Sequence, residues 1–272
     1  MMKAPSAGYT GSLATNYIAA RGITDSGHIA ALNTLEAALF SAGLINADGS
    51  SNGKLKSLYL YGWTNFSAAE HKFNFLNPVD SDSAFRDTYY GGLTHNSSGI
   101  TGNGVDGYID SHFKHSDFPG QNNAHIMTYC RNNFADGSYA LYGAVDNSFL
   151  GTRHLPKLSS TSYKSIYGST GGGDANTDAS GLWIHSRTGA SAEVMYRNGA
   201  TRWTLNRPSS ATGSTASILD LAVDYDNGSL KYQNAPANIC AKGRGGGLTS
   251  TEAAAYSAAL NAYFTSAGLN IY

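Results

Sequence analysis

Residues 181–206 read GLWIHSRTGASAEVMYRNGATRWTLN, and this stretch decides the fold class. Apolar and polar side chains alternate on both sides of Asn198-Gly199, a dipeptide that favours a two-residue β-hairpin turn. A β-strand repeats its side-chain direction at every second residue. We therefore predict strands at 181–187, 191–197 and 201–206, with the last two joined as a hairpin.

Further strand-like runs lie on either side of this stretch. They occur at 56–63, 124–131, 138–145, 218–225 and 230–233. Asn227-Gly228 predicts a second hairpin turn, and Asp136-Gly137 predicts a weaker third one. Many short strands joined by turn residues, with helices only at the two ends, indicate a sandwich or a barrel. We expect a mainly β protein.

The first predicted helix follows Asp25 or Ser26, either of which can cap its N-terminus. Gly43 is placed to end this helix in the left-handed conformation. The apolar residues on one stripe of the helix are Ile29, Leu32, Leu35, Leu39 and Phe40.

A second helix is predicted near the C-terminus, at 249–267. Thr249 and Glu252 have the spacing of a capping box, and Gly268 is placed to end the helix. Its apolar stripe consists of Tyr256, Leu260 and Phe264. Because the two helices end in similar sequences, we expect them to lie near each other.

We predict three regions along the chain. Residues 1–22 are small, polar and glycine-rich, which predicts an extended N-terminal arm. Residues 23–50 form a helix and a connector, and residues 51–272 form the β-sandwich domain that ends in the C-terminal helix. Within that domain, 169–180 (STGGGDANTDAS) is polar enough to predict a mobile surface loop.

The composition excludes several classes of partner. Charged residues make up 14% of the chain and the net charge is −1, so no basic surface for nucleic acid is expected. No run of about 18 apolar residues occurs, so no membrane insertion is predicted. The N-terminus has no apolar core of a signal peptide. Cys130 and Cys240 both lie in strand-like stretches; we predict buried free thiols, and a disulfide between them stays an alternative.

Motifs for catalysis are weak in this sequence. The glycine-rich stretch 243–247 (GRGGG) lacks the Lys-Ser/Thr of a phosphate-binding loop, so we expect a flexible connector there. No Gly-x-Ser-x-Gly motif is present. Glu193 stands on a predicted hairpin with Arg197 and Arg202 as its expected neighbours, without the second carboxylate that glycoside hydrolysis needs. We predict a protein that is not an enzyme.

Two short segments resemble metal-binding motifs. His112 and His115 lie three residues apart with Asp110 nearby, a spacing that could hold zinc, but 112–120 (HFKHSDFPG) fits a polar loop better. The segment that begins at Asp224 has no glutamate at the twelfth position of a calcium loop, which favours a hairpin. Asp106 and Asp110 remain candidate Ca²⁺ ligands at an edge of the sandwich; no other cofactor is expected.

Aromatic residues suggest the binding surface. Eighteen tyrosines and three tryptophans are more than a core of this size needs, and such rings stack on sugars and on protein surfaces. In Tyr89-Tyr90, and in 59–63 (YLYGW), neighbouring side chains alternate between faces, so at least one ring of each should lie outside the core. The candidate ligand-binding residues are Tyr89, Tyr90, His95, His112 and His115.

From residue 24 to residue 108 the sequence resembles a group of bacteriophage and prophage virion structural proteins, of the tail-fibre or receptor-binding type. The segments that carry the resemblance are 31–35 (ALNTL), 71–74 (HKFN), 84–86 (AFR), 91–99 (GGLTHNSSG), 103–104 (NG) and 107–108 (GY). Later segments that resemble the group are 125–131 (HIMTYCR) and 248–254 (LTSTEAA). The middle, roughly 135–240, is supported by the strand pattern alone.

The resemblance implies a jelly-roll antiparallel β-sandwich of the laminin-G/concanavalin A-like type within a virion that assembles in the host cytoplasm. It implies other virion proteins and further copies of this chain as partners, as a homo-oligomer such as a trimer, and a host-surface glycan as ligand. The alternatives are a free-standing carbohydrate-binding module and a polysaccharide depolymerase.

Overall fold

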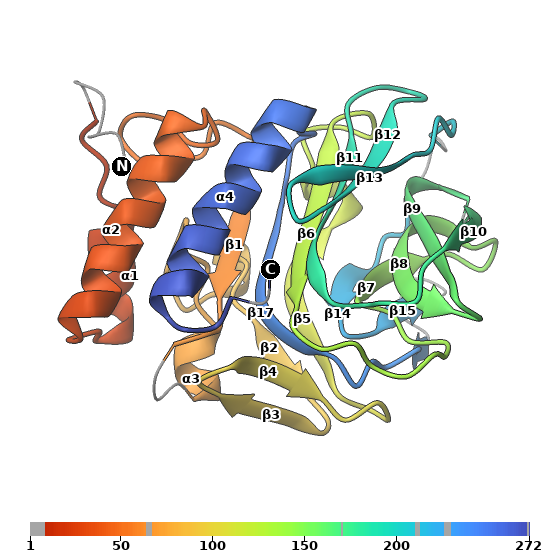
Figure 1. The fold of residues 1–272 in the computed structure, drawn as a ribbon, viewed down its shortest axis with the longest axis horizontal. Coiled ribbons are helices and arrows are strands. Elements are labelled where there is room, and N and C mark those ends of the chain that lie inside the picture. The colour runs from red at the N-terminus through yellow and green to blue at the C-terminus, as the bar shows by residue number, and fades with distance from the viewer. Residues whose placement is uncertain (1–8, 64–66, 170, 210–212, 226–229, 271) are drawn as a thin grey trace.

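The computed structural model describes residues 9–63, 67–169, 171–209, 213–225, 230–270 and 272. It has three layers: helices, a sheet beneath them, and a second sheet on the far side of the first (Figure 1). The helices are α1 (Leu13–Arg21), α2 (Ser26–Ser41), α3 (Ala68–His71) and α4 (Ser250–Ser266), with short 3-10 turns η1 (Asp82–Ala84) and η2 (His115–Asp117).

The sheet next to the helices, here the helix-side sheet, has strand order β13-β12-β11-β6-β17-β4-β3, with β1 also paired to β17. Its strands are β1 (Ser57–Leu60), β3 (Leu93–Asn96), β4 (Gly99–Gly102), β6 (Ala124–Cys130), β11 (Gly181–Arg187), β12 (Glu193–Arg197), β13 (Ala200–Thr204) and β17 (Asn238–Gly245).

The other sheet, here the outer sheet, has strand order β10-β9-β8-β7-β14-β5-β2. Its remaining strands, β15 and β16, pair with each other, and β15 runs parallel to β7. The strands are β2 (Thr88–Tyr90), β5 (Tyr108–Lys114), β7 (Tyr142–Val145), β8 (Leu150–Leu158), β9 (Thr161–Ser169), β10 (Gly171–Ala175), β14 (Ser217–Asp220), β15 (Val223–Tyr225) and β16 (Leu230–Tyr232). The expected antiparallel β-sandwich with a helix at each end is confirmed.

Two apolar clusters fill the spaces between the layers. In β6, Met127 and Tyr129 pack toward the helices, whereas Ile126 and Cys130 pack toward the outer sheet. Because both faces of this strand are covered, all seven of its residues are buried. We predicted that at least one aromatic ring of 59–63 would lie outside the core. This prediction is wrong, because Tyr59, Tyr61 and Trp63 are all buried.

The predicted helix signals are confirmed. The Asp25 carboxylate accepts the backbone N–H of His28, and Thr249 and Glu252 form the capping box of α4. Gly43 and Gly268 follow these helices with φ of 70° and 68°. Helices α2 and α4 pack side by side on the helix-side sheet.

Residues 1–22 are not an extended arm throughout, which corrects the first domain boundary. Residues 13–21 form α1, and Leu13, Ala14 and Tyr17 are buried in the core beneath the helices. The arm prediction failed because this helix has no side-chain cap of its own next to it in the sequence. Residues 1–8 of the predicted arm lie outside the described residues.

Two other segments were predicted as irregular and are strands. Part of the predicted loop at 169–180 forms β10, which pairs with β9 at the edge of the outer sheet. The glycine-rich stretch at 243–247 begins within β17, a central and fully buried strand. Glycine is required there because a Cβ on Gly245 would lie 2.1 Å from the carbonyl oxygen of Lys54. The stretch is therefore a tightly packed strand end.

The long strand predicted at 218–225 is broken. Leu221 has φ of 64°, and this left-handed residue separates β14 from β15. The β15–β16 pairing agrees with a hairpin here, although its predicted turn, Asn227-Gly228, lies outside the described residues. The Asn198-Gly199 turn is confirmed, with φ of 54° and 81°.

Both cysteines are buried and free, as predicted. Cys130 belongs to the cluster between the sheets, whereas Cys240 belongs to the cluster beneath the helices. Because their side chains lie on opposite faces of the helix-side sheet, the alternative of a disulfide between them is wrong.

Candidate functional site

The outer face of β2 and β5 carries the residues best placed to contact a ligand. In β5, Ile109, Ser111 and Phe113 are buried, and the residues between them are partly exposed. Strands β2 and β5 are antiparallel, with Tyr90 opposite Tyr108 and Thr88 opposite Asp110. Because side chains alternate along a strand, Tyr90, Tyr108 and Asp110 belong to the solvent side of the outer sheet.

Tyr90 and Tyr108 form a stacked aromatic pair on this face. Their ring centroids are 4.7 Å apart with an interplanar angle of 14°. Tyr90 is 41% exposed, one of few large hydrophobic side chains this accessible in the described part of the chain. Burial raises the pKa of Tyr108, and the nearby Asp110 and Asp224 carboxylates raise it further. The pair is therefore a neutral aromatic surface in negative surroundings.

The alternation of β5 places His112 on the same face, and the strand is distorted at this residue. The register between β5 and β14 shifts between the pairs Lys114–Ser217 and Asp110–Leu219, which marks a bulge. His112 lies within the bulge at φ of 60°, a conformation that non-glycine residues rarely adopt. Bulges are frequent next to functional sites.

His112 has polar neighbours on three sides and hydrogen bonds to two of them. Its Nε2 lies 3.0 Å from Thr88 Oγ1 and 3.4 Å from Asp82 Oδ1. Its backbone N–H donates to Asp110 Oδ1 at 2.7 Å. The carboxylates, hydroxyl and imidazole beside the tyrosine pair could both donate and accept hydrogen bonds to a bound sugar. We call Thr88, Tyr90, Tyr108, Asp110 and His112 the tyrosine face.

Tyr89 and His95 lie together, but in a different group from Tyr90. The Tyr89 ring packs edge-on against His95 at 4.5 Å, and His95 Nδ1 lies 3.0 Å from His71 Nδ1. Burial lowers the pKa of His95, and it lowers the pKa of His71 to about 3. Tyr90 is thus the exposed ring of its pair, as the alternation predicted.

His115 does not belong to the candidate site, which is a correction. Its Nε2 lies 2.9 Å from Thr152 Oγ1, its Nδ1 lies 3.0 Å from the carbonyl oxygen of Ser214, and its ring packs against Tyr167. Burial lowers the pKa of His115 to about 4. The predicted polar loop at 112–120 begins instead within β5 and continues into η2, which turns His115 into the interior.

The two candidate calcium ligands have local partners. Asp106 Oδ1 accepts the backbone N–H of Gly92 at 3.0 Å and the Asn103 amide at 2.7 Å, which fixes the turn before β5. Asp110 holds the bulge at His112. No group of three metal-ligating side chains occurs among the residues that the structure describes. Calcium at Asp106 and Asp110 stays a prediction.

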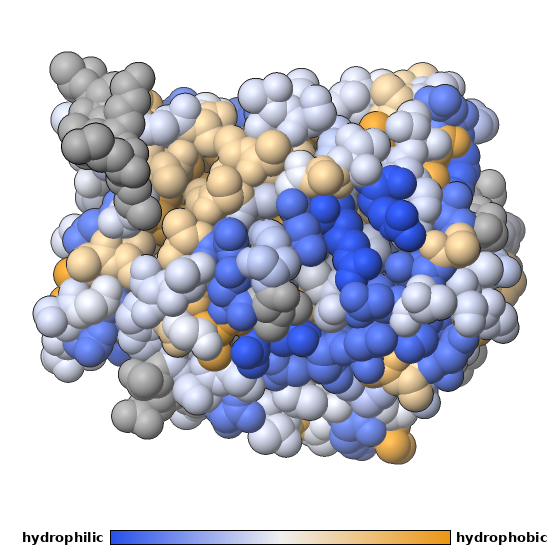
Figure 2. All heavy atoms as spheres, in the orientation of Figure 1, coloured by the Kyte–Doolittle hydropathy of each residue, from blue (hydrophilic) through white to orange (hydrophobic). Residues whose placement is uncertain are grey.

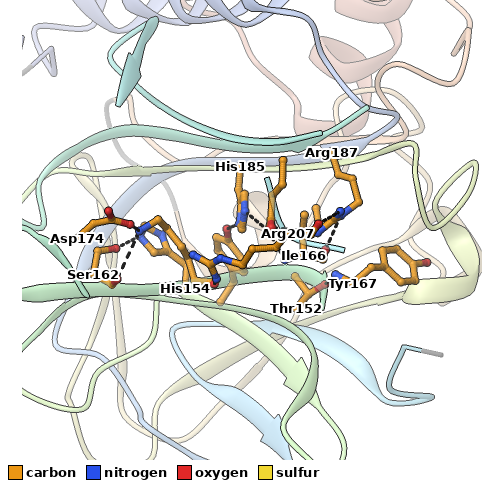
Figure 3. Close-up of polar contacts among 12 residues, drawn as sticks. Thr152, His154, Ser162, Ile166, Tyr167, Asp174, His185, Arg187 and Arg207 are labelled. Carbon is orange, nitrogen blue, oxygen red and sulfur yellow. Dashed lines mark hydrogen bonds and ion pairs between the residues drawn. The ribbon is translucent and has the colours of Figure 1, made fainter. Parts of the chain in front are cut away.

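A buried polar cluster between the sheets was missed by the sequence analysis. Glu193 accepts hydrogen bonds from His185 Nε2 at 2.7 Å, from Arg187 at 2.9 Å and from the backbone N–H of Ile166 at 2.9 Å. Figure 3 labels these three partners, His185, Arg187 and Ile166. Tyr142 completes the chain at 3.2 Å from His185 Nδ1. Burial raises the pKa of Glu193, but His185 and Arg187 outweigh it and hold that pKa below its usual value.

The sequence predicted Arg197 and Arg202 as the neighbours of Glu193, but neither of them contacts it. Arg197 bonds to Asp178 instead, and Arg202 packs on Trp203. The signal that could have found the cluster is the alternation of β11, which places His185 and Arg187 on one face next to β12. His185, Glu193 and Tyr142 are each at most 1% exposed, so the cluster holds the two sheets together and is not open to a substrate.

A groove of about 890 Å³ runs between α2 and α4 on the outside of the helix layer. It is lined mostly by alanines, among them Ala30, Ala38, Ala258 and Ala262, together with Leu35 and Tyr263 and a few small polar side chains. Figure 2 shows these mildly hydrophobic atoms gathered over the helices, with hydrophilic atoms over the neighbouring strands. Among the described residues that line this groove, none carries a charge. No helix in the described residues has the length and hydrophobicity to cross a membrane.

No family model and no curated protein matches this chain. Among solved structures, a mutant of Trypanosoma rangeli sialidase displaying trans-sialidase activity is similar over 92% of this chain and 38% of its own, with 11% identity and a TM-score of 0.53. Trypanosoma rangeli sialidase in complex with the inhibitor DANA is similar over 75% of this chain and 32% of its own length, with 9% identity and a TM-score of 0.50.

A third structure is domain 4 of AbnA, a GH43 extracellular arabinanase from Geobacillus stearothermophilus, in complex with arabinotriose. It is similar over 75% of this chain and 98% of its own, with 15% identity and a TM-score of 0.48. The chain spans about a third of the length of the sialidases it matches. At these identities the likeness shows a shared β-sandwich fold.

Proposed function

We propose that this chain is a non-enzymatic attachment protein of a bacteriophage particle and that its tyrosine face binds a host-surface glycan. The observation that carries the proposal is the stacked, accessible Tyr90–Tyr108 pair beside the bulge that presents His112. Flat aromatic surfaces pack against the C–H faces of sugar rings. The neighbouring polar groups provide the hydrogen bonds that would orient the sugar.

The charges around the pair favour a neutral glycan over an acidic one. Asp110 and Asp224 act on Tyr108, and the Lys231 ammonium near it is engaged at 2.6 Å by Asp224. An anionic sugar would be repelled by the carboxylates at this surface. We expect uncharged hexose or N-acetylhexosamine units to bind better than sugar acids.

The glutamates support a function without catalysis. Glu36, Glu70 and Glu252 each accept hydrogen bonds from backbone N–H groups at a helix start. The fourth, Glu193, is buried in the cluster between the sheets. A glycosidase would need an accessible acid paired with a second carboxylate. All four glutamates of this chain have structural partners instead.

The virion context rests on the sequence resemblance described above. The tyrosine face lies on the outer sheet, and the helix layer lies on the opposite side of the molecule (Figure 1). In a particle, the helix layer would meet other virion proteins or further copies of this chain while the tyrosine face points outward. Individually weak contacts then gain strength because several copies bind at once.

A glycan array with the purified chain tests the binding proposal. Wild type should bind a set of neutral glycans, and Tyr90→Ala and Tyr108→Ala should lose that signal. Phe149→Ala is the matched control, because Phe149 is 47% exposed and packs on Tyr225, not on the tyrosine pair. Equal array signals from wild type and both tyrosine variants would show that this face is not the binding site.

The particle assignment needs a separate experiment. Antibodies raised against the purified chain should label intact phage particles in immunogold electron microscopy. Glycan binding without labelled particles would favour the alternative of a free-standing carbohydrate-binding module. Release of oligosaccharides from a bound polysaccharide would favour the depolymerase.

A further inference from the structure

Four charged side chains meet in the interior between the two sheets. Lys242 and Arg244 come from β17, Asp220 ends β14, and Asp87 directly precedes β2. Lys242 Nζ lies 2.7 Å from Asp87 Oδ1 and 2.7 Å from Asp220 Oδ2, and Arg244 lies 2.6 Å from the same Asp220 oxygen. All four side chains are at most 1% exposed. We call them the buried quartet.

Charges this deep are unfavourable unless they are paired very well. Burial raises the pKa of Asp87 to about 6, and attraction to Lys242 offsets this effect only in part. Burial therefore weakens the preference of Asp87 for its ionised form, and it favours a reaction that removes charge from the interior. Removing the Lys242–Asp87 charges would still leave the interior neutral, because Arg244 and Asp220 balance each other.

We propose that Lys242 and Asp87 are joined by an intramolecular amide bond. A proton moves from the Lys242 ammonium through Asp220 to the Asp87 carboxylate, which gives a free amine and a carboxylic acid. The amine nitrogen attacks Cγ of Asp87 and forms the C–N bond. The C–Oδ1 bond then breaks, and this oxygen leaves as water with one proton from the acid and one from the amine. One water is the only other product, and no co-reactant enters.

The surroundings of the two groups favour this reaction. The amine touches the carboxyl group that it attacks, which replaces a bimolecular encounter with a prearranged contact. The Tyr61 hydroxyl donates to Asp87 Oδ2 at 2.5 Å, so it polarises the oxygen that becomes the amide carbonyl. Asp220 Oδ1 has no hydrogen-bond partner among the described residues and is available to relay the proton.

Aromatic rings keep water away from the bond. The Tyr59 ring lies 4.5 Å from Lys242 Nζ, and Phe113 packs against Arg244. In this dry interior the released water is not replaced, so hydrolysis back to the two side chains is disfavoured. The bond would connect residues 155 positions apart and tie the last strand of the sandwich to the segment that enters it. This inference does not depend on the proposed glycan binding.

Mass spectrometry of the denatured full-length chain tests the proposal. Wild type should be lighter than its sequence mass by one water. A tryptic digest should contain the peptide that starts at Asp87 joined to the peptide that contains Lys242. A wild-type mass equal to the sequence mass, after prolonged incubation of the folded protein, overturns the proposal.

Variants identify the bond. Asp87→Ala should have its full sequence mass, whereas Asp87→Asn should reach the same final mass as wild type because ammonia leaves instead of water. Asp174→Ala is the matched control: it removes the partner of another buried lysine, Lys164, and should keep the loss of one water. Asp220→Asn should stay at its full mass; cross-linking at the wild-type rate overturns the proton relay.

Discussion

The Glu36 carboxylate accepts the backbone N–H of Leu13 at 2.7 Å, although the two residues lie 23 positions apart and in different helices. Its second oxygen accepts the N–H of Ala14 at 3.0 Å. The first N–H groups of a helix have no partner within the helix, and Ser12, at the N-cap position, makes no side-chain bond to them. A glutamate of α2 therefore caps α1.

Glu36→Ala should destabilise the protein by about 2 kcal/mol, the upper range for loss of a helix cap. The substitution leaves two N–H groups at a buried helix start without an acceptor. Thr34→Ala, at an exposed position of α2, is the control and should change stability by less than about 0.5 kcal/mol. Urea unfolding at neutral pH measures both variants, and equal midpoints would contradict this role of Glu36.

Acid should unfold the protein below pH 6.5. Burial lowers the pKa of His28 and His71 to about 3 and of His115 and His125 to about 4. Between these values and the ordinary pKa of about 6.5, the unfolded chain binds protons that the folded chain does not. Each such histidine then lowers the free energy of unfolding by about 1.4 kcal/mol per pH unit.

Where Asp87 is not joined to Lys242, this carboxyl acts in the opposite direction, because its raised pKa makes the folded chain bind a proton first. Four histidines outweigh this one carboxyl. The thermal midpoint should fall steeply from pH 6.5 to pH 5. A thermal midpoint that stays constant between pH 7.5 and pH 5 would show that these histidines are not held neutral in the fold.

Glu193→Gln should cost about 3–5 kcal/mol of stability, because it leaves Arg187 buried without its counter-charge. Glu70→Gln is the control. It is a more exposed glutamate at the start of a short helix, and its loss should cost about 1 kcal/mol or less. Chemical denaturation compares the two. Similar small effects for both variants would mean that the cluster between the sheets contributes little to stability.

Local signals predicted the parts of the fold that depend on neighbours in the sequence. Asp25, Gly43 and the Thr249–Glu252 box fixed the helix ends, and Asn198-Gly199 fixed a hairpin. Helix α1 was missed because its cap comes from Glu36, on another element. The start of β17 was predicted as strand-like around Cys240, but its glycine-rich end was predicted as a connector, because Gly245 is required by the approaching backbone of Lys54, a contact that no local pattern reveals.

In the candidate site, too, only the features that depend on neighbours in the sequence were predicted. Alternation along β2 indicated that one ring of Tyr89-Tyr90 would lie outside, and Tyr90 does. Its partner Tyr108 was not among the predicted binding residues, because the pair depends on the register between β2 and β5. We predicted His115 at the surface because its neighbours in the sequence are polar. The turn after β5 instead buries its side chain against Thr152.

The central claim is that Tyr90 and Tyr108 form the floor of a glycan-binding surface. Isothermal titration of wild type with a neutral oligosaccharide selected on the array, compared with the Tyr90→Ala/Tyr108→Ala double variant, tests it most directly. Loss of stacking on one sugar ring should weaken binding at least tenfold, a change of about 1.4 kcal/mol. The Phe149→Ala control should bind like wild type. An unchanged dissociation constant in a correctly folded double variant would contradict the claim.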